Sequence, residues 1–345
     1  MPAVKAEGYG HGAIECARAL EAAGADWFGV ALPEEGLALR DSGITRPILC
    51  LGGFWDGQEE LIIARDLTPT VFRIEQLAQL SAAAEAAACV VDYHLKVDTG
   101  MGRLGVPYRD LEQFLKDLSG IKNVRMSGLM THIASADDPA QKAFTEGQIA
   151  LFEHALAAVR RSGHNPEWVH QANSATTVAY PRGRGNLVRI GGLMYGIWRD
   201  ATSPEAASLD LRPVMSLRTQ ITLIKSFAAG SPIGYGSTYV TARESLIATL
   251  PIGYSDGLRR ALSNKGQVIV RGELVPVVGR ISMDLTTVDV TDVPGAKVGD
   301  EVIIFGNQGL ASISAEEVAC KCGTIAYEIT CQVGDRVPRI YRPSR

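Results

Sequence analysis

The sequence predicts an α/β fold in two parts: a parallel (β/α)8 TIM-like barrel over residues 1–204 and a mainly β domain over residues 205–345. Two observations carry this prediction. Up to about residue 200, short apolar runs alternate with amphipathic stretches, a pattern typical of parallel strands joined by helical crossovers. After about residue 205 the runs become β-branched and punctuated by turns, with few helical patterns between them. Eight alternating units favour a closed barrel.

The first part contains eight strand-like runs, in chain order PAVKA, WFGVA, PILCL, PTVF, YHLKV, MSGLMTHI, EWVHQAN and LVRIGG. Helical patterns separate several of them. After the first run, Ile14, Ala17 and Leu20 share one helical face and Gly24 marks a stop. A longer helix is expected at residues 141–162, with one face formed by Phe144, Leu151, Ala155 and Val159.

In the second part, strands are expected in LRPVMSLRTQITLIKSF, SLIATLPIG, GQVIVRG, LVPVVGRISMDLTTVDV and GDEVIIFG. One short helix is expected near Ser314–Cys320. A β domain with a single helical piece follows from this pattern.

Composition excludes several classes of function. The net charge is −4 and no basic cluster stands out, so no nucleic-acid partner is expected. No apolar run approaches the ~20 residues that span a bilayer, and the first residues lack the apolar core of a signal peptide. A cytoplasmic protein is therefore expected. Neither the six scattered cysteines nor the six histidines form a pair at metal-ligand spacing, so no metal is predicted.

Lys5 and Tyr9 are the first candidate site residues. Chemistry in a parallel barrel lies at the carboxyl ends of the strands, and Lys5 lies near the end of the first run. A desolvated lysine has a lowered pKa and can form a Schiff base with an aldehyde cofactor. Tyr9, flanked by Gly8 and Gly10, could reach a phosphate. A strand lysine is otherwise most often a snorkelling side chain.

The stretch VKAEGYGHG resembles the cofactor-lysine signature of the alanine racemases, enzymes that use pyridoxal 5′-phosphate (PLP) and consist of a β/α barrel and a β domain. Eight further stretches follow in family order: DTGMGRLG, MTHIASAD, HQANSATT, VRIGGLMYG, IGYGSTY, PIGYSDGLRR, GRISMD and RVPRIY. The resemblance thus covers nearly the whole chain. Each stretch alone is weak evidence for the family, but the whole set in this order is specific to it.

The resemblance implies that PLP is bound by Lys5, Tyr9, Arg103, His132, Ser174, Arg189, Gly191 and Gly192. Lys5 would hold the aldehyde, and Arg189 would face the pyridine nitrogen, where related barrel decarboxylases place an acid. Ser174 is expected to cap a helix and to bind the phosphate, together with Tyr9 and the two glycine N–H groups. His132 would tie Arg189 to a second catalytic tyrosine.

That tyrosine is Tyr235, which the resemblance places in the site of the partner subunit of a homodimer. Racemisation needs acid–base groups on both faces of the substrate, and Lys5 and Tyr235 would supply them. Substrate contacts are implied for Arg103, Met283 and Asp284, and supporting roles for Lys96, Tyr254, Arg260, Arg280 and Asp137. Lys96 matches a lysine that is carbamylated in many members.

Departures from the family pattern give further expectations. Members usually carry about thirty residues before the lysine motif, so a version of this chain extended upstream is expected to melt at a higher temperature. Glu7 stands where asparagine or aspartate is commoner, and Ser135 replaces a frequent alanine. Asp335 stands where well-known members have tyrosine, which predicts a wider and more polar entrance and better turnover of serine. The Asp335 carboxylate is expected either to turn away from the phosphate, toward Arg280, or to stay protonated.

We therefore expect a homodimeric racemase that interconverts L- and D-alanine and supplies D-alanine for peptidoglycan. The first alternative is a racemase of broader specificity for serine or basic amino acids. The second is a PLP-carrying barrel without catalysis, against which the β domain with Tyr235 argues. The third, a metal-dependent barrel hydrolase, lacks histidines at ligand spacing.

Overall fold

The computed structural model describes residues 1–197 and 209–342. The chain divides into two compact units, with main bodies Met1–Met194 and Arg212–Arg345. The boundary predicted between residues 204 and 205 lies outside the described residues and stays a prediction.

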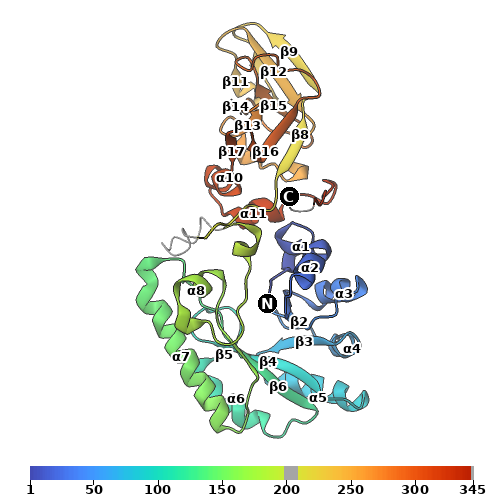
Figure 1. The fold of residues 1–345 in the computed structure, drawn as a ribbon, viewed down its shortest axis with the longest axis vertical. Coiled ribbons are helices and arrows are strands. Elements are labelled where there is room, and N and C mark those ends of the chain that lie inside the picture. The colour runs from blue at the N-terminus through green and yellow to red at the C-terminus, as the bar shows by residue number, and fades with distance from the viewer. Residues whose placement is uncertain (198–208, 343–345) are drawn as a thin grey trace. The chain divides into compact units, whose positions relative to one another are not determined.

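A parallel sheet forms the frame of the first unit (Figure 1). Its strands follow the order β1 (Phe28–Val30), β2 (Ile48–Cys50), β3 (Leu67–Val71), β4 (Val91–Asp98), β6 (Val124–Met130) and β7 (Trp168–His170). The short strand β5 (Val106–Pro107) pairs with β4 away from this path. Every pairing along the path is parallel, as the β/α alternation predicts.

Two further segments close the sheet into a barrel. Pro2 forms a parallel bridge with Ile190, and Ala3 forms one with Gly29 of β1. On the far side, the Arg189 N–H donates to the Ala172 carbonyl, just beyond β7, at 3.0 Å. The eight predicted runs therefore all lie in one closed ring, which confirms the predicted fold class.

Helices lie outside these strands (Figure 1). They are α2 (Ala13–Ala22), α3 (Pro33–Asp41), α4 (Glu59–Ala64), α5 (Ile74–Ala86), α6 (Leu111–Leu118), α7 (Lys142–Arg161) and α8 (Ser174–Ala179). The face predicted for α7 was wrong at Phe144, whose side chain is 43% exposed. Ala155 and Val159 are buried as predicted. Ile149 and Phe152 are buried as well, since these four residues repeat at helical spacing along the side that faces the barrel. No described helix has the length and hydropathy needed to cross a membrane.

The second unit is mainly β, as predicted. One antiparallel sheet has the order β15 (Thr286–Asp289), β12 (Ser245–Leu250) and β9 (Leu223–Phe227). A second has the order β14 (Glu273–Pro276), β13 (Gln267–Val270), β16 (Glu301–Gln308) and β17 (Ala311–Ile313), with β8 (Leu217–Gln220) paired to β16. The strands β10 (Pro232–Ile233) and β11 (Tyr239–Val240) form a separate hairpin.

The prediction of a single helix in the second unit was wrong, because its described residues form two α-helices: α10 (Ala315–Cys322) and α11 (Ala326–Cys331). The first has clear end signals. The Ser314 hydroxyl accepts from the Glu317 N–H at 3.1 Å, the Glu317 carboxylate accepts from the Ser314 N–H, and Gly323 ends the helix with a φ of 70°. Helix α11 has no side-chain cap and contains β-branched residues, so its helical state depends on packing.

Candidate active site

Lys5 opens a left-handed turn directly after the first barrel segment. Element α1 (Lys5–Tyr9) has positive φ angles at Ala6 (52°), Glu7 (55°) and Gly8 (60°), a conformation that costs L-residues energy. Glu35 of α3 holds the turn, because its carboxylate accepts from the Ala6 N–H at 2.7 Å and from the Ala31 N–H at 2.6 Å. A fixed turn of this kind places Lys5 at its start and Tyr9 at its end.

Tyr9 meets a glycine cradle. A Cβ atom on Gly191 would lie 2.5 Å from the Tyr9 hydroxyl, and the Gly191 N–H donates to the Ser174 hydroxyl at 3.0 Å. The predicted helix cap at Ser174 was wrong, because Asn173 caps α8 by accepting from the Thr176 N–H at 2.9 Å. The Ser174 hydroxyl is thereby left to face Gly191. Gly192 follows as the first residue of a short 3-10 turn, Gly192–Tyr195.

Substitution of Gly191 by alanine is expected to weaken binding of PLP, the cofactor that the resemblance implies, about ten- to one-hundredfold. The added methyl group would displace the Tyr9 hydroxyl. Fluorescence titration of the cofactor-free protein with PLP measures the affinity. The double variant Gly191→Ala/Tyr9→Phe removes the clashing oxygen together with its contact to the phosphate, so it is compared with Tyr9→Phe alone. Equal affinities of these two variants would attribute the loss in Gly191→Ala to the clash. If Gly191→Ala alone binds PLP with the affinity of the parent, Gly191 and Tyr9 do not form the phosphate site.

Arg189 is buried at the same end of the barrel. Its NH1 group donates to His170 Nδ1 at 2.8 Å, and its NH2 group donates to the Thr131 and Gln171 carbonyls at 2.8 and 3.1 Å. Burial lowers the pKa of Arg189 to about 10, so the guanidinium stays charged at neutral pH. None of the described residues accepts a hydrogen bond from its Nε–H.

His132 lies 3.3 Å from the Arg189 NH2 group through its Nδ1. Burial, and then the neighbouring charge of Arg189, holds the pKa of His132 well below its ordinary value. A neutral imidazole can therefore accept from Arg189. The predicted contact between these two residues is present, whereas the link to a catalytic tyrosine stays a prediction.

Lys96 of β4 is buried among cations. Burial and the charges of Arg189, Arg103 and Lys5 lower the pKa of its amine to about 8, while Asp98 acts in the opposite direction. Asp98 also shapes the loop that carries Arg103, because its carboxylate accepts from the N–H groups at positions 100–102 over 2.8–3.2 Å. The Arg103 side chain is exposed.

In the second unit, predicted residues surround a cavity of about 420 Å³. Its lining consists of Tyr235, Tyr254, Arg260, Ile281, Ser282, Met283, Asp284 and Leu285. The side chains of Tyr235 and Met283 are 71% and 53% exposed. Arg280 lies behind the turn of Tyr235, since a Cβ on Gly236 would be 3.1 Å from its NH1.

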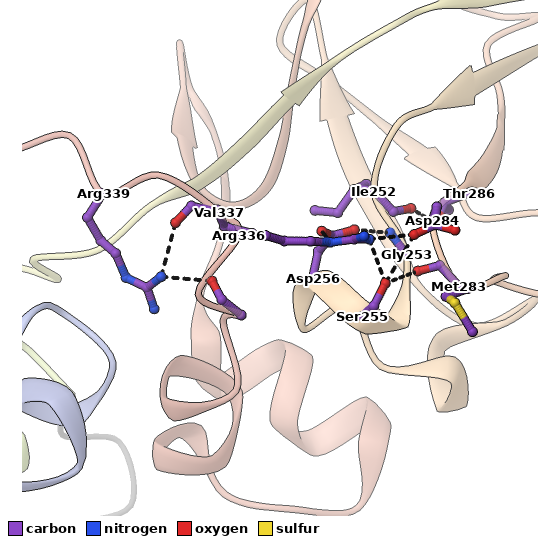
Figure 2. A network of polar contacts seen from close by, with 11 residues as sticks. Ile252, Gly253, Ser255, Asp256, Met283, Asp284, Thr286, Arg336, Val337 and Arg339 are labelled. Atoms are coloured by element: carbon purple, nitrogen blue, oxygen red, sulfur yellow. Dashed lines mark hydrogen bonds and ion pairs between the residues drawn. The ribbon is translucent and has the colours of Figure 1, made fainter.

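Arg336 organises the loop that carries Met283 and Asp284 (Figure 2). It donates to Asp256 at 2.6 Å, to Asp284 at 2.6 Å and to the Ser255 hydroxyl at 2.5 Å. Ser255 in turn donates to the Met283 carbonyl at 2.7 Å. The bond from Arg336 lowers the pKa of the Asp284 carboxyl below its ordinary value.

The remaining predicted residues are exposed. Asp137 lies in the loop after β6, and Asp335 directly precedes Arg336. No ion pair joins Asp335 to Arg280 in the part of the chain that the structure describes, so their expected approach is not seen. Within residues 1–197 and 209–342, no three His, Cys, Asp or Glu side chains gather closely enough to hold a metal ion.

Several residues that position the site were missed from the sequence. They are Glu35, His94, Asp98, Asn173, His170, Asp256 and Arg336. The two histidines carried a signal, since each lies in a predicted strand near a candidate residue. The others act on backbone N–H groups or loops that only the folded chain brings to them.

Comparison with known proteins agrees with this geometry. Residues 1–198 match the family model "Alanine racemase, N-terminal domain", and residues 214–341 match "Alanine racemase, C-terminal domain". The alanine racemase of Desulfovibrio desulfuricans is 45% identical over 340 residues, covering 99% of this chain and 90% of the relative. That of Halothermothrix orenii is 43% identical, covering 99% and 89%.

Solved structures agree as well. The alanine racemase of Streptomyces lavendulae superposes with a TM-score of 0.93 at 38% identity, covering all of this chain and 91% of the other. The Bacillus anthracis enzyme with bound L-Ala-P has a TM-score of 0.90 at 37% identity, covering 100% and 88%. The chain therefore belongs to the alanine racemase family, and it is an enzyme of the isomerase class.

Proposed function

We propose that this enzyme interconverts L- and D-alanine with PLP, as a cytoplasmic homodimer that supplies D-alanine for peptidoglycan. The observation that carries the proposal is the juxtaposition of the buried Arg189 with the cradle of Tyr9, Ser174 and Gly191 at the end of the barrel where Lys5 lies. Family membership and the alanine racemases among its relatives support the same substrate.

The residues present fit PLP. The Tyr9 and Ser174 hydroxyls meet at a glycine whose missing Cβ leaves room for a phosphate. The Nε–H of Arg189 is a donor that no described residue uses, which suits a pyridine nitrogen as acceptor. Lys5 is the amine that would hold the aldehyde. The cofactor could thus be bound at its phosphate, its ring nitrogen and its aldehyde.

When bound, PLP supplies the electron withdrawal that makes the Cα–H bond of the amino acid acidic. The Lys5 amine would take the α-proton on one face, and the hydroxyl of Tyr235 of the partner subunit would deliver a proton on the other. The two groups exchange roles for the reverse reaction. Arg103 would bind the substrate carboxylate. Arg189 does not give up its proton, so it would leave the ring nitrogen unprotonated and the ring only moderately electron-withdrawing.

Exposure around the cavity of the second unit supports a shared site. The aromatic ring of Tyr235 and the thioether of Met283 are left open beside Arg260 and Asp284. Exposed apolar groups next to charged ones are typical of a surface that a partner covers. We infer that this cavity completes the partner's active site, with Met283 and Asp284 near the substrate.

Lys96 is proposed to be carbamylated. Its neutral amine would add CO₂ and release one proton, and the resulting anion would offset the charges of Arg189, Arg103 and Lys5. The reaction needs the uncharged amine, which is about half the population at pH 8 and about one hundredth at pH 6, given a pKa of about 8.

A carbamate carbon signal is therefore expected in ¹³C NMR after incubation with ¹³C-bicarbonate at pH 8, and it should decline toward pH 6. The Lys96→Ala variant should lack it, while Lys116→Ala, which alters an exposed lysine of α6, should keep it. A signal that persists in Lys96→Ala would assign the carbamate elsewhere.

Racemisation by the purified, PLP-loaded protein on a panel of amino acids tests the proposal. We expect D-alanine from L-alanine, and the reverse, with the highest kcat/KM of the panel. Higher turnover of serine, lysine or arginine would favour the broader racemase instead. The exposed carboxylate of Asp335, where a tyrosine is frequent, is the feature that keeps serine on the panel.

A further inference from the structure

Two histidines lie behind Arg189 inside the barrel. His170 ends β7, and its Nδ1 is 2.8 Å from the Arg189 NH1 group. His94 of β4 is also fully buried, and its Nδ1 is 2.9 Å from His170 Nε2. The three side chains thus form one chain of hydrogen bonds that leads from the barrel interior to the guanidinium.

Only one arrangement of protons satisfies this chain. A guanidinium has donors and no acceptor, so His170 Nδ1 must accept and the proton of His170 must sit on Nε2. The Nε2–H group then donates to His94 Nδ1, which leaves the proton of His94 on its own Nε2. Both rings are therefore neutral, in the same tautomer. Burial supports this state, since it lowers the pKa of His94 to about 3 and holds that of His170 well below its ordinary value.

The barrel interior is shaped around the ring of His94. A Cβ on Gly128 of the neighbouring strand β6 would lie 2.4 Å from that ring, so only glycine leaves room for it. The His94 Nε2 atom has no hydrogen-bond partner among the described residues. The centroid of the Trp27 ring lies 5.2 Å from that of His94, at an interplanar angle of 49°. The His94 position thus holds an imidazole that packs against an aromatic ring and beside a glycine.

We propose that His94 is a positioning residue, which fixes the His170 tautomer and thereby provides Arg189 with an acceptor that holds its guanidinium in place. Without His94, His170 could place its proton on Nδ1, where it would oppose the Arg189 NH1 donor. The Thr131, His170 and Gln171 carbonyls would still bind the guanidinium. We therefore expect the Arg189 guanidinium to become more mobile in a His94 variant but to remain at the same position. The consequence for PLP binding depends on the proposed function, whereas the tautomer does not.

Long-range ¹⁵N–¹H NMR of the full chain labelled with ¹⁵N-histidine, without cofactor or substrate, tests the tautomer. Six histidines are present, and single-residue variants assign them. The parent should show His94 and His170 neutral with protons on Nε2. A proton on Nδ1 of His170, or a doubly protonated ring, would overturn the proposal without any variant, whatever the enzyme's activity.

Two substitutions test the dependence on His94. His94→Leu removes the acceptor, and we expect His170 to populate both tautomers and PLP affinity to fall about tenfold. His94→Asn keeps an acceptor near the Nδ1 position, and we expect it to retain the His170 tautomer and to bind PLP within about threefold of the parent. If His94→Leu folds and leaves the tautomer unchanged, His94 does not position His170.

Discussion

Replacement of Lys5 by alanine is expected to lower kcat/KM for alanine racemisation by at least about 10⁴-fold. A positioned general base usually contributes about 10²–10⁴-fold, and here the same amine would also hold the cofactor. Lys96 is the other lysine near Arg103 and Arg189. It is buried and belongs to β4, so it is not expected to take over the role of Lys5. Chiral chromatography of the products measures the rate in both directions.

The Lys5→Ala protein is expected to fold, because the hydrogen bond from the Ala6 N–H to Glu35, which holds the turn of α1, is donated by a backbone group that the substitution keeps. Lys116→Ala is the matched control, with no change in rate. Borohydride reduction of the parent should label the peptide that contains Lys5. A label on the Lys96 peptide, or an active Lys5→Ala enzyme, would refute the assignment.

Replacement of Tyr235 by phenylalanine is expected to lower kcat about 10²–10³-fold, since it removes the hydroxyl that would serve the second face. The ring is largely exposed, so the free energy of unfolding should change by less than about 0.5 kcal/mol. Tyr254→Phe alters the other tyrosine of the same cavity and should retain most of the activity. Equal losses of kcat in the two variants would mean that activity depends on the cavity as a whole and not on the Tyr235 hydroxyl in particular.

The barrel could be predicted from the sequence because its strands are short apolar runs and because helical patterns separate them. All eight runs lie in the ring, even though two of them meet their neighbours only through single bridges. Helix α11 could not be predicted, since its β-branched residues favour strand locally and tertiary packing decides its state. Phe144 fits the helical period but lies at the edge of the buried face, where only the folded chain shows that it is exposed.

Predictions of the site were limited in a similar way. The side chains expected to contact the cofactor lie within short motifs, so the resemblance to the family identified them. The residues that hold those motifs act at longer range: Glu35 bonds to a backbone N–H 29 positions earlier, and Arg336 bonds to Asp256 across 80 positions. The cap of α8 was predicted one residue too late. Ser174 was expected to cap the helix, whereas the neighbouring Asn173, also a favourable capping residue, caps it in the structure.

We propose above all that each active site combines Lys5 of one subunit with Tyr235 of the partner subunit. Co-expression of Lys5→Ala and Tyr235→Phe chains with different affinity tags, followed by purification on both tags, yields the mixed dimer. In a shared arrangement one of its two sites carries both defects and the other carries none. We predict about half the kcat of the parent dimer, while each homodimeric variant stays nearly inactive. A mixed dimer that folds and binds PLP but is no faster than the two variants would contradict the claim.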